Sequence, residues 1–269
     1  MPIGSYTLVV NTSDGYSDCW EPFFLLLDRY WPELNAPILL NTERAKFSQP
    51  TVHAVRSTRV NDGIDRRLTW GECVLRCLEL VETPLVLYMQ EDYFLEERVD
   101  HAVIDSLAAL MIKDPSIAQI GLTAFGSRGP FSPTADERLW RVAPRASYRT
   151  SLQAALWRVD VMRSYVRPDE NGWMFEIYGT RRSWRRPETF LSLNRDREAA
   201  RRVLPYSMAG IVKGQWWPTV PAFFTREAIT MNFVRRGFYR SHLGPLEKLR
   251  TLKKLMENPR LFIRGMTGR

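Results

Sequence analysis

Short apolar runs alternate with segments of helical spacing along the first half of the chain. The runs predict buried strands over residues 6–11, 36–42, 51–56, 84–90 and 117–123. Apolar residues at helical spacing predict helices over residues 20–31, 70–82 and 98–114. Because strands that alternate with helices form parallel sheets with right-handed crossovers, the chain predicts an α/β fold with a mostly parallel central sheet.

The pattern of the second half is less regular. Residues 125–150 are rich in Gly, Pro, Ser and Arg, which predicts a mobile or substrate-covering loop. Residues 151–159 predict a further strand with a helix after it. The next stretch, "ENGWMFEIYG", brings Glu170, Trp173 and Glu176 close together along the chain.

Two adjacent acids, Glu91 and Asp92, stand at the end of a strand that is otherwise apolar. Because an unpaired buried charge is costly, carboxylates in such a place need partners. Ligands of parallel sheets bind just beyond the carboxyl ends of the strands, where the loop 12–14 also falls. Two carboxylates there could hold a divalent cation together with a diphosphate, since Mg²⁺ takes hard oxygen ligands. Solvation or pairing with nearby arginines explains the acids equally well, and the pattern leaves both interpretations open.

The stretch around Trp173 suggests a base beside a flat apolar surface. A carboxylate that deprotonates a hydroxyl must lie within hydrogen-bond reach of it, and burial beside a tryptophan raises the pKa of that carboxylate. Trp173 also offers a face on which a sugar ring can stack. A helix with Trp173 in the core and acids paired to Arg181 or Arg182 is the alternative, and the residues alone favour it.

The charge of the chain is concentrated at one end. The net charge is +8, and residues 235–269 carry ten basic and two acidic residues, which accounts for the whole excess. A basic tail suggests an anionic surface, either lipid headgroups or nucleic acid, although a solvated helix explains it as well. Among cations outside the tail, Lys213 is the best candidate to neutralise a leaving diphosphate, because Gly214 lets the backbone approach a ligand closely.

Several classes of protein are disfavoured by missing patterns. The sequence has no GxxxxGK[ST] loop, no strand–GxGxxG–helix unit and no G-x-S-x-G elbow. Three histidines and three cysteines without metal-ligand spacing disfavour a zinc site. The start of the chain lacks a charged segment before a cleavage site, and no apolar run approaches the roughly 20 residues of a membrane span. We therefore expect a cytoplasmic protein.

With these residues considered together, the chain resembles bacterial glycosyltransferases of the GT-A fold, similar to family 2 members in polysaccharide and O-antigen synthesis. The matching pieces are "VVNTSDGYSDCWEPFF", "TWGECVLRCLELVETPLVLYMQEDYFL", "SLQAALWRVDVM", "ENGWMFEIYG" and "AGIVKGQW". The resemblance implies a Rossmann-like nucleotide-sugar-binding domain over residues 1–234. Its donor-binding half would cover about 1–125 and its acceptor half about 126–234, with 235–269 as a basic helical tail.

The resemblance also implies site residues. The Asp-x-Asp metal motif of the family maps to Gln90-Glu91-Asp92, where Gln90 replaces the first acid, so that Asp92 is the first metal-ligand candidate and Glu91 the second. Donor-binding candidates are Asn11, Thr12, Ser13, Asp14, Asp65, Arg66, Glu91 and Lys213. Substrate-binding candidates are Trp173 and Tyr93. The candidate bases are Glu176 and, as the alternative, Glu170.

The function implied by the resemblance is transfer of a sugar from a nucleotide-sugar to a glycan or lipid-linked acceptor, with inversion. Expected partners are the donor, Mn²⁺ or Mg²⁺, an anionic membrane surface bound through 235–269 at the inner face of the cytoplasmic membrane, and a second copy in a homodimer. Nucleic acid is not expected.

Two rival functions stay open on the sequence. A nucleotidyltransferase acting on a sugar phosphate would share the sheet and the acids, but "NTSDGYSDCW" lacks the basic residues expected after its first strand. A non-catalytic carbohydrate- or nucleic-acid-binding protein would use the basic tail and would bind nucleic acid in a salt-dependent manner.

Overall fold

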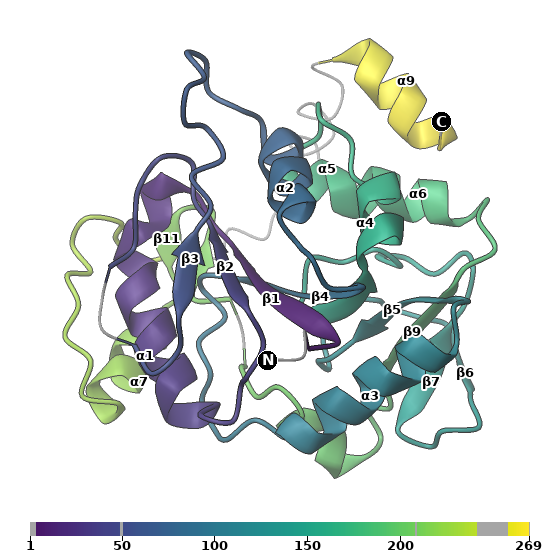
Figure 1. The fold of residues 1–269 in the computed structure, drawn as a ribbon, viewed down its shortest axis with the longest axis horizontal. Helices are drawn as coiled ribbons and strands as arrows, with labels where there is room; N and C mark the ends of the chain where they lie inside the picture. The colour runs from purple at the N-terminus through teal and green to yellow at the C-terminus, as the bar shows by residue number, and fades with distance from the viewer. Residues whose placement is uncertain (1–3, 49–50, 208, 241–257, 269) are drawn as a thin grey trace.

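The computed structural model describes residues 4–48, 51–207, 209–240 and 258–268 (Figure 1). Within these ranges, nine strands form one sheet in the order β3-β2-β1-β4-β8-β5-β9-β7-β6. The strands are β1 (Tyr6–Asn11), β2 (Ile38–Asn41), β3 (Val55–Ser57), β4 (Leu85–Gln90), β5 (Ile117–Gly121), β6 (Phe131–Pro133), β7 (Leu139–Val142), β8 (Ala155–Arg158) and β9 (Thr189–Leu193).

The sheet is mostly parallel. The strands from β3 to β4 pair in parallel, and β5 pairs in parallel with β9. Only β8 and β7, among the described strands, run opposite to the others. The predicted α/β fold, with the Rossmann-like sheet expected of a GT-A protein, is confirmed.

Helices cover both faces of this sheet (Figure 1). The helices are α1 (Trp20–Tyr30), α2 (Trp70–Glu79), α3 (His101–Lys113), α4 (Val159–Tyr165), α5 (Gly172–Met174), α6 (Thr180–Ser183), α7 (Val220–Arg226) and α9 (Pro259–Thr267). Shorter turns are η1 (Asp14–Cys19), the π-helical turn η2 (Phe175–Gly179) and η3 (Glu198–Arg202), and a small hairpin joins β10 (Ile211–Val212) to β11 (Gln215–Trp216).

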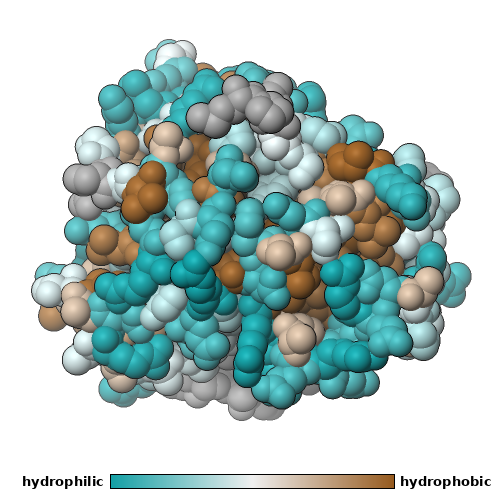
Figure 2. All heavy atoms as spheres, turned by 60° about the horizontal axis from the view of Figure 1, so that its bottom comes forward, coloured by the Kyte–Doolittle hydropathy of each residue, from teal (hydrophilic) through white to brown (hydrophobic). Residues whose placement is uncertain are grey.

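Two hydrophobic cores lie on opposite sides of the sheet. Alternate residues of a strand point to opposite faces, and β1 follows this rule. Leu8 and Val10 of β1 pack with α1 and α3, whereas Val9 packs with α2 and α4. On the face shown in Figure 2, hydrophobic side chains reach the surface in patches between hydrophilic ones. Because the central strands are buried on both faces, they appear in the sequence as continuous apolar runs.

One predicted segment is partly wrong. Residues 125–150, expected to form a mobile or substrate-covering loop, contain β6 and β7, which extend the sheet beyond β9. Leu139 and Val142 of β7 are buried, and β7 is hydrogen-bonded to β9. The strands are only three and four residues long, so the surrounding Gly, Pro and Ser conceal their pattern. The predicted strand over 51–56 is also shorter than expected, since β3 is Val55–Ser57.

The predicted tail is described in two pieces. Residues 235–240 pack on the β10–β11 hairpin, where Tyr239 N–H donates to Trp216 O at 2.9 Å. Helix α9 occupies the end of the tail. The tail also carries leucines at every third position, namely 246, 249, 252 and 255, and these lie outside the described residues. None of the helices described is both long enough and apolar enough to cross a bilayer. The domain boundaries near residues 125 and 234 stay predictions.

Candidate active site

A cavity of about 420 Å³ lies at the carboxyl ends of β1 and β4. Asn11 and Gln90 end these strands and are partners in the parallel register, so the segments that follow them lie side by side. The cavity is lined by Asn11, Thr12, Ser13, Tyr16, Trp70, Gln90, Glu91, Asp92, Tyr93, Leu152, Gln153, Gly172, Trp173, Glu176, Ala209 and Ile211. Eight of the sequence-predicted site residues are therefore brought together, from segments up to 165 positions apart in the chain.

The acid pair lines this cavity next to the β10 segment. Glu91 and Asp92 are 7% and 5% exposed. Asp92 Oδ2 accepts a hydrogen bond from Ile211 N–H at 3.0 Å, whereas Asp92 Oδ1 is buried without a partner in the described structure. Gly210 lies against the Asp92 carbonyl, where an added Cβ would be 3.1 Å from that oxygen and 2.3 Å from Phe94. The close approach of this glycine fixes the Asp92 backbone.

Burial makes both acids weak. It raises the pKa of Glu91 well above its ordinary value, with the adjacent Asp92 charge as a second cause. It raises the pKa of Asp92 to about 6, partly offset by the Ile211 N–H bond. Two buried carboxylates with an unpartnered oxygen attract a proton or a cation, because either relieves their desolvation.

An arginine missed by the sequence analysis lies beside these acids. Arg236 is held by Asp18, with Nε to Oδ2 at 2.7 Å and Nη2 to Oδ1 at 2.5 Å. Its guanidinium lies 4.5 Å from the centre of the Tyr16 ring, which lines the cavity, and its side chain is 9% exposed. Its charge partly offsets the rise in pKa of both Glu91 and Asp92. A fixed positive charge therefore stands near the acid pair, behind the lining residue Tyr16.

The loop after β1 lines the cavity next to the segment that carries the acid pair. Asn11 Oδ1 accepts from Asn41 Nδ2 at 2.9 Å, and Thr12 Oγ1 accepts from Trp20 Nε1 at 2.8 Å. Ser13 also lines the cavity. Asp14 does not: its carboxylate accepts three backbone N–H groups of residues 43–45 at 2.9–3.0 Å. Asp14 thus holds the neighbouring loop, and its position does not support direct donor binding.

Glu176 enters the cavity from the helical segment that follows β8 and α4. The segment starts at Asn171, whose side chain accepts from Met174 N–H at 2.9 Å. Glu176 Oε1 accepts from Leu152 N–H at 2.9 Å and from Ser151 Oγ at 3.3 Å. Burial raises the pKa of Glu176, and these two hydrogen bonds partly offset the rise. Trp173, one turn earlier, lines the cavity beside it.

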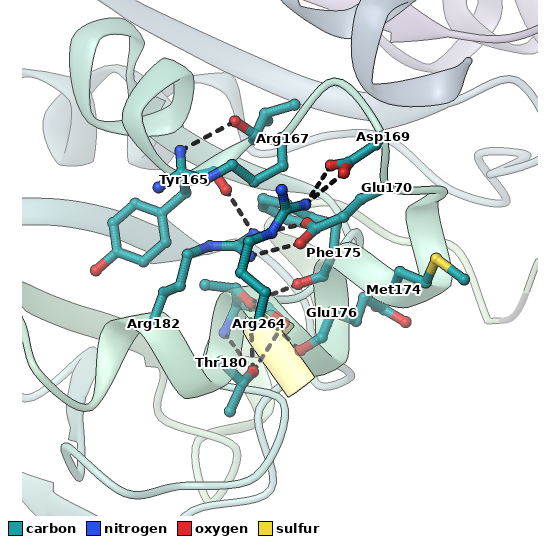
Figure 3. Close-up of polar contacts among 12 residues, drawn as sticks. Tyr165, Arg167, Asp169, Glu170, Met174, Phe175, Glu176, Thr180, Arg182 and Arg264 are labelled. Carbon is teal, nitrogen blue, oxygen red and sulfur yellow. Dashed lines mark hydrogen bonds and ion pairs between the residues drawn. The ribbon is translucent and has the colours of Figure 1, made fainter. Parts of the chain in front are cut away.

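Glu170 lies outside the cavity in a closed ion pair. Its oxygens accept from Arg182 Nη1 at 2.6 Å and Nη2 at 2.7 Å, and the two side chains are 0% and 4% exposed (Figure 3). Arg182 also donates to Tyr165 O at 2.7 Å. Since both carboxylate oxygens of Glu170 accept hydrogen bonds from Arg182, the structure does not support Glu170 as the alternative base. Of the two candidate acids, Glu170 is the one that pairs with Arg182, whereas Glu176 bonds to Leu152 and Ser151.

The remaining predicted residues are spread over the molecule. Tyr93 is nearly buried and contributes to the cavity wall, with its ring stacked on Tyr206 at 4.6 Å. Asp65 is exposed, and Arg66 is paired with Glu72 at 2.5–2.9 Å. Lys213 occupies the β10–β11 turn, with its ammonium 5.8 Å from the Tyr239 ring centre. Asp65, Arg66 and Lys213 do not line the cavity.

The donor set fits a hard divalent cation that brings further ligands with it. Glu91 and Asp92 offer carboxylate oxygens, and the unpartnered Asp92 Oδ1 is a free acceptor. Among the described residues, no group of three or more His, Cys, Asp or Glu forms a complete protein cage. Mg²⁺ is commonly held by one or two carboxylates plus phosphate oxygens, so this pair fits a metal that arrives with a diphosphate.

Four aromatic, polar or charged residues that line or neighbour the cavity escaped the sequence analysis, namely Tyr16, Trp70, Gln153 and Arg236. A local signal existed for Trp70: Thr69 and Glu72 form a capping box, which places Trp70 at the first turn of α2. Arg236 had no such signal, because its partner Asp18 is 218 positions away.

Comparisons with known proteins give structural similarity only. No protein-family model matches the chain, and no curated protein sequence matches it. Two of the solved structures that match it in backbone arrangement are from S. aureus and from a mycobacterium. The crystal structure of S. aureus TarS 1-349 has a TM-score of 0.43 and 11% identity, over 69% of this chain and 60% of that one. A mycobacterial protein has a TM-score of 0.43 and 14% identity, over 84% of this chain and 76% of that one. This chain thus spans less than two thirds of the TarS structure.

Proposed function

We propose that this protein is a glycosyltransferase that moves a sugar from a nucleotide-sugar donor to a hydroxyl of a glycan or lipid-linked acceptor, with inversion. The observation that carries the proposal is one cavity lined by two kinds of chemical group. The buried acids Glu91 and Asp92 line it with Arg236 beside them, and Glu176 and Trp173 line it as well. The loop 11–13 adds polar groups to the same lining, which would suit a nucleoside.

The donor would lie across the strand ends. Asn11, Thr12 and Ser13, which line the cavity, would contact its nucleoside, and the diphosphate would lie at Asp92. The positive charge of Arg236 would stabilise the negative charge that grows on the departing diphosphate. A divalent cation held by Asp92 and Glu91, when bound, would supply further charge neutralisation there.

Glu176 is the proposed base. Its carboxylate would take the proton of the acceptor hydroxyl as that oxygen bonds to the anomeric carbon. The bond from that carbon to the diphosphate breaks on the opposite face, so the nucleoside diphosphate leaves with the electron pair. A raised pKa suits this role, because a base works best when its pKa approaches the operating pH. Trp173 would hold a sugar ring in the same cavity as Glu176 through its apolar face.

The basic segment 235–269 would bring the enzyme to an anionic membrane at the cytoplasmic face, where lipid-linked acceptors lie. A homodimer is a further part of the proposal.

A thermal-shift screen tests the function. The protein is heated with nucleoside diphosphates and nucleotide-sugars, each with Mg²⁺, with Mn²⁺ or with a chelator, and each binding ligand raises Tm because it binds only the native state. We expect at least one nucleotide-sugar to raise Tm and to be consumed when glycan acceptors are added. Consumption of a nucleoside triphosphate and a sugar phosphate with pyrophosphate release would indicate the nucleotidyltransferase instead. Binding of nucleic acid without turnover of any nucleotide-sugar would indicate the non-catalytic protein.

A further inference from the structure

The segment that carries Glu176 has a second face, and helix α9 covers it. The helices α5, η2 and α6 follow one another without a break from Gly172 to Ser183. Glu176 lines the cavity, whereas Tyr178 is fully buried next to α9. Two residues that are two positions apart on a helix project on nearly opposite sides. The same turn therefore faces the cavity on one side and the C-terminal helix on the other.

A small hydrophobic cluster joins α9 to the cavity wall. Tyr178 and Leu261 are its buried centre. Partly buried side chains packed around them are Trp173, Met174, Ile177 and Phe262. Because Trp173 also lines the cavity, the cluster extends from α9 to the proposed sugar-binding surface.

The fit between α9 and the turn is close. A Cβ added at Gly265 would lie 2.4 Å from two atoms of the Tyr178 ring, so this position admits only glycine without movement of the helix. Arg264 Nη2 donates to the carboxylate of Asp169 at 2.6 and 2.5 Å (Figure 3). At the end of α9, Gly268 has φ +67°, and a Cβ there would lie 3.1 Å from Arg181 O. The helix thus contacts the segment before, within and after the π-helical turn.

The π-helical turn η2 has an uncommon backbone geometry. π-helical turns are rare, mostly single turns inside α-helices, and they recur at functional sites. Such a turn persists only where its surroundings hold it. Here the cavity side offers the Leu152 N–H and Ser151 hydroxyl bonds to Glu176, and the other side offers the Tyr178–α9 contact.

We propose that α9 is a positioning element of the active site, whose docking on Tyr178 holds the π-helical turn in the register that sets the Glu176 carboxylate against Leu152 N–H. Gly265 and Leu261 act through Tyr178 and contact no substrate. The catalytic consequence rests on the proposed function, whereas the coupling between α9 and Glu176 does not.

Two substitutions undock α9 by different means, and a third is the control. Gly265→Leu puts a side chain into the Tyr178 ring, and Leu261→Asp puts a charge into the buried cluster. Ile263→Ala, on the same helix, changes a side chain that is 61% exposed. Amide hydrogen exchange is followed at Leu152, whose N–H bonds to Glu176, and at Gly268, whose N–H donates to Gly265 O at 3.2 Å at the end of α9 and which no variant replaces.

Both undocking variants are expected to speed exchange at Gly268 and at Leu152 by about tenfold or more, and the control to stay within about twofold of wild type. Faster exchange in α9 with unchanged exchange at Leu152 would overturn the proposal. Unchanged exchange at both sites in both variants would overturn it too, since the close contact would then not fasten the helix.

The donor found by thermal shift adds a kinetic readout. Undocking is expected to lower kcat about tenfold or more while the donor KM stays within about twofold, because Glu176 is displaced and the donor loop is not. An unchanged kcat in a variant with undocked α9 would contradict the positioning role. If no nucleotide-sugar binds, the proposed function fails, and the exchange experiment still decides whether α9 and Glu176 are coupled.

Discussion

At the scale of single residues, the surroundings of each acid decide what it can do. Both carboxylate oxygens of Glu170 accept hydrogen bonds from Arg182, so Glu170 is held in a buried ion pair. Glu176 is half-buried with a raised pKa and faces the cavity, as a base would. Asp92 has one oxygen anchored by a backbone N–H and the other unpartnered, as a ligand for a cation would.

Glu176→Gln is expected to keep donor binding within about twofold and to lower sugar transfer by about 10²–10⁴-fold, the usual contribution of a general base. In the wild type, protonation of Glu176 removes the base. The acidic limb of the rate profile is therefore expected above the ordinary value of 4.5, because burial raises the pKa of Glu176. Transfer rates measured from pH 4 to 8 check both points. A variant with wild-type turnover would remove Glu176 from the mechanism.

Asp92→Asn is expected to stabilise the metal-free protein at neutral pH. Burial raises the pKa of Asp92 from 3.8 to about 6, so between these values the folded state binds more protons than the unfolded chain. The free energy of unfolding therefore falls as pH rises through this window, by on the order of 3 kcal/mol, and Asn avoids that fall.

Urea unfolding in the presence of a chelator, at pH 4 and pH 7.5, measures this difference between wild type and Asp92→Asn. Added Mg²⁺ or Mn²⁺ with a nucleoside diphosphate is expected to reverse the order. An equal pH dependence in the two proteins would show that Asp92 is not destabilised by burial.

At the scale of elements, the segment 172–183 is fixed at both ends. Asn171 caps its start, and the buried Glu170–Arg182 pair ties the residue before that cap to α6. The exposed Asp169–Arg264 pair adds a link to α9, with side chains 49% and 42% exposed. Buried and exposed ion pairs differ greatly in what their loss costs, so the two pairs make a matched comparison.

Glu170→Ala is expected to lower the free energy of unfolding by about 3–5 kcal/mol, since it leaves the Arg182 charge buried and unpaired. Arg264→Ala, which breaks the exposed pair, is expected to cost at most about 1 kcal/mol. Chemical denaturation at pH 7 of both variants gives the comparison. Equal and small costs would mean that Glu170 is free for another role.

The elements that the sequence predicted well are those with local patterns. The ends of β1 and β4 could be predicted from their continuous apolar runs. Because ligands of parallel sheets bind beyond the carboxyl ends of the strands, Thr12, Ser13 and Asp92 could then be predicted to lie near one another, and they line one cavity. Sequence alone did not separate Glu170 from Glu176, because six positions of spacing say nothing about which acid meets Arg182. Arg236 was also not identified, because it was counted among the charges of the basic tail and its partner Asp18 is far away in the chain.

At the scale of the whole molecule, charge is unevenly distributed. The ten basic and two acidic residues of 235–269 together account for the net charge of +8. A body near neutrality with a basic end is expected to bind anionic vesicles, with about 1 kcal/mol from each basic residue near the surface.

Co-sedimentation with phosphatidylserine-containing vesicles is expected at low salt and to weaken as salt is raised, because screening shortens the range of these charges. Vesicles of phosphatidylcholine alone are the control. A variant with Lys253→Glu and Lys254→Glu is expected to lose most of the binding. Equal binding to both kinds of vesicle would argue against an electrostatic anchor.

We propose that one cavity holds an activated sugar between Asp92 and Glu176. The decisive measurement is a crystal structure with the nucleotide-sugar found by thermal shift, together with Mn²⁺. We expect nucleoside density beside Asn11–Ser13, the metal and diphosphate at Glu91 and Asp92, and the sugar facing Glu176 and Trp173. Density for the donor elsewhere, or a diphosphate remote from Asp92, would contradict it.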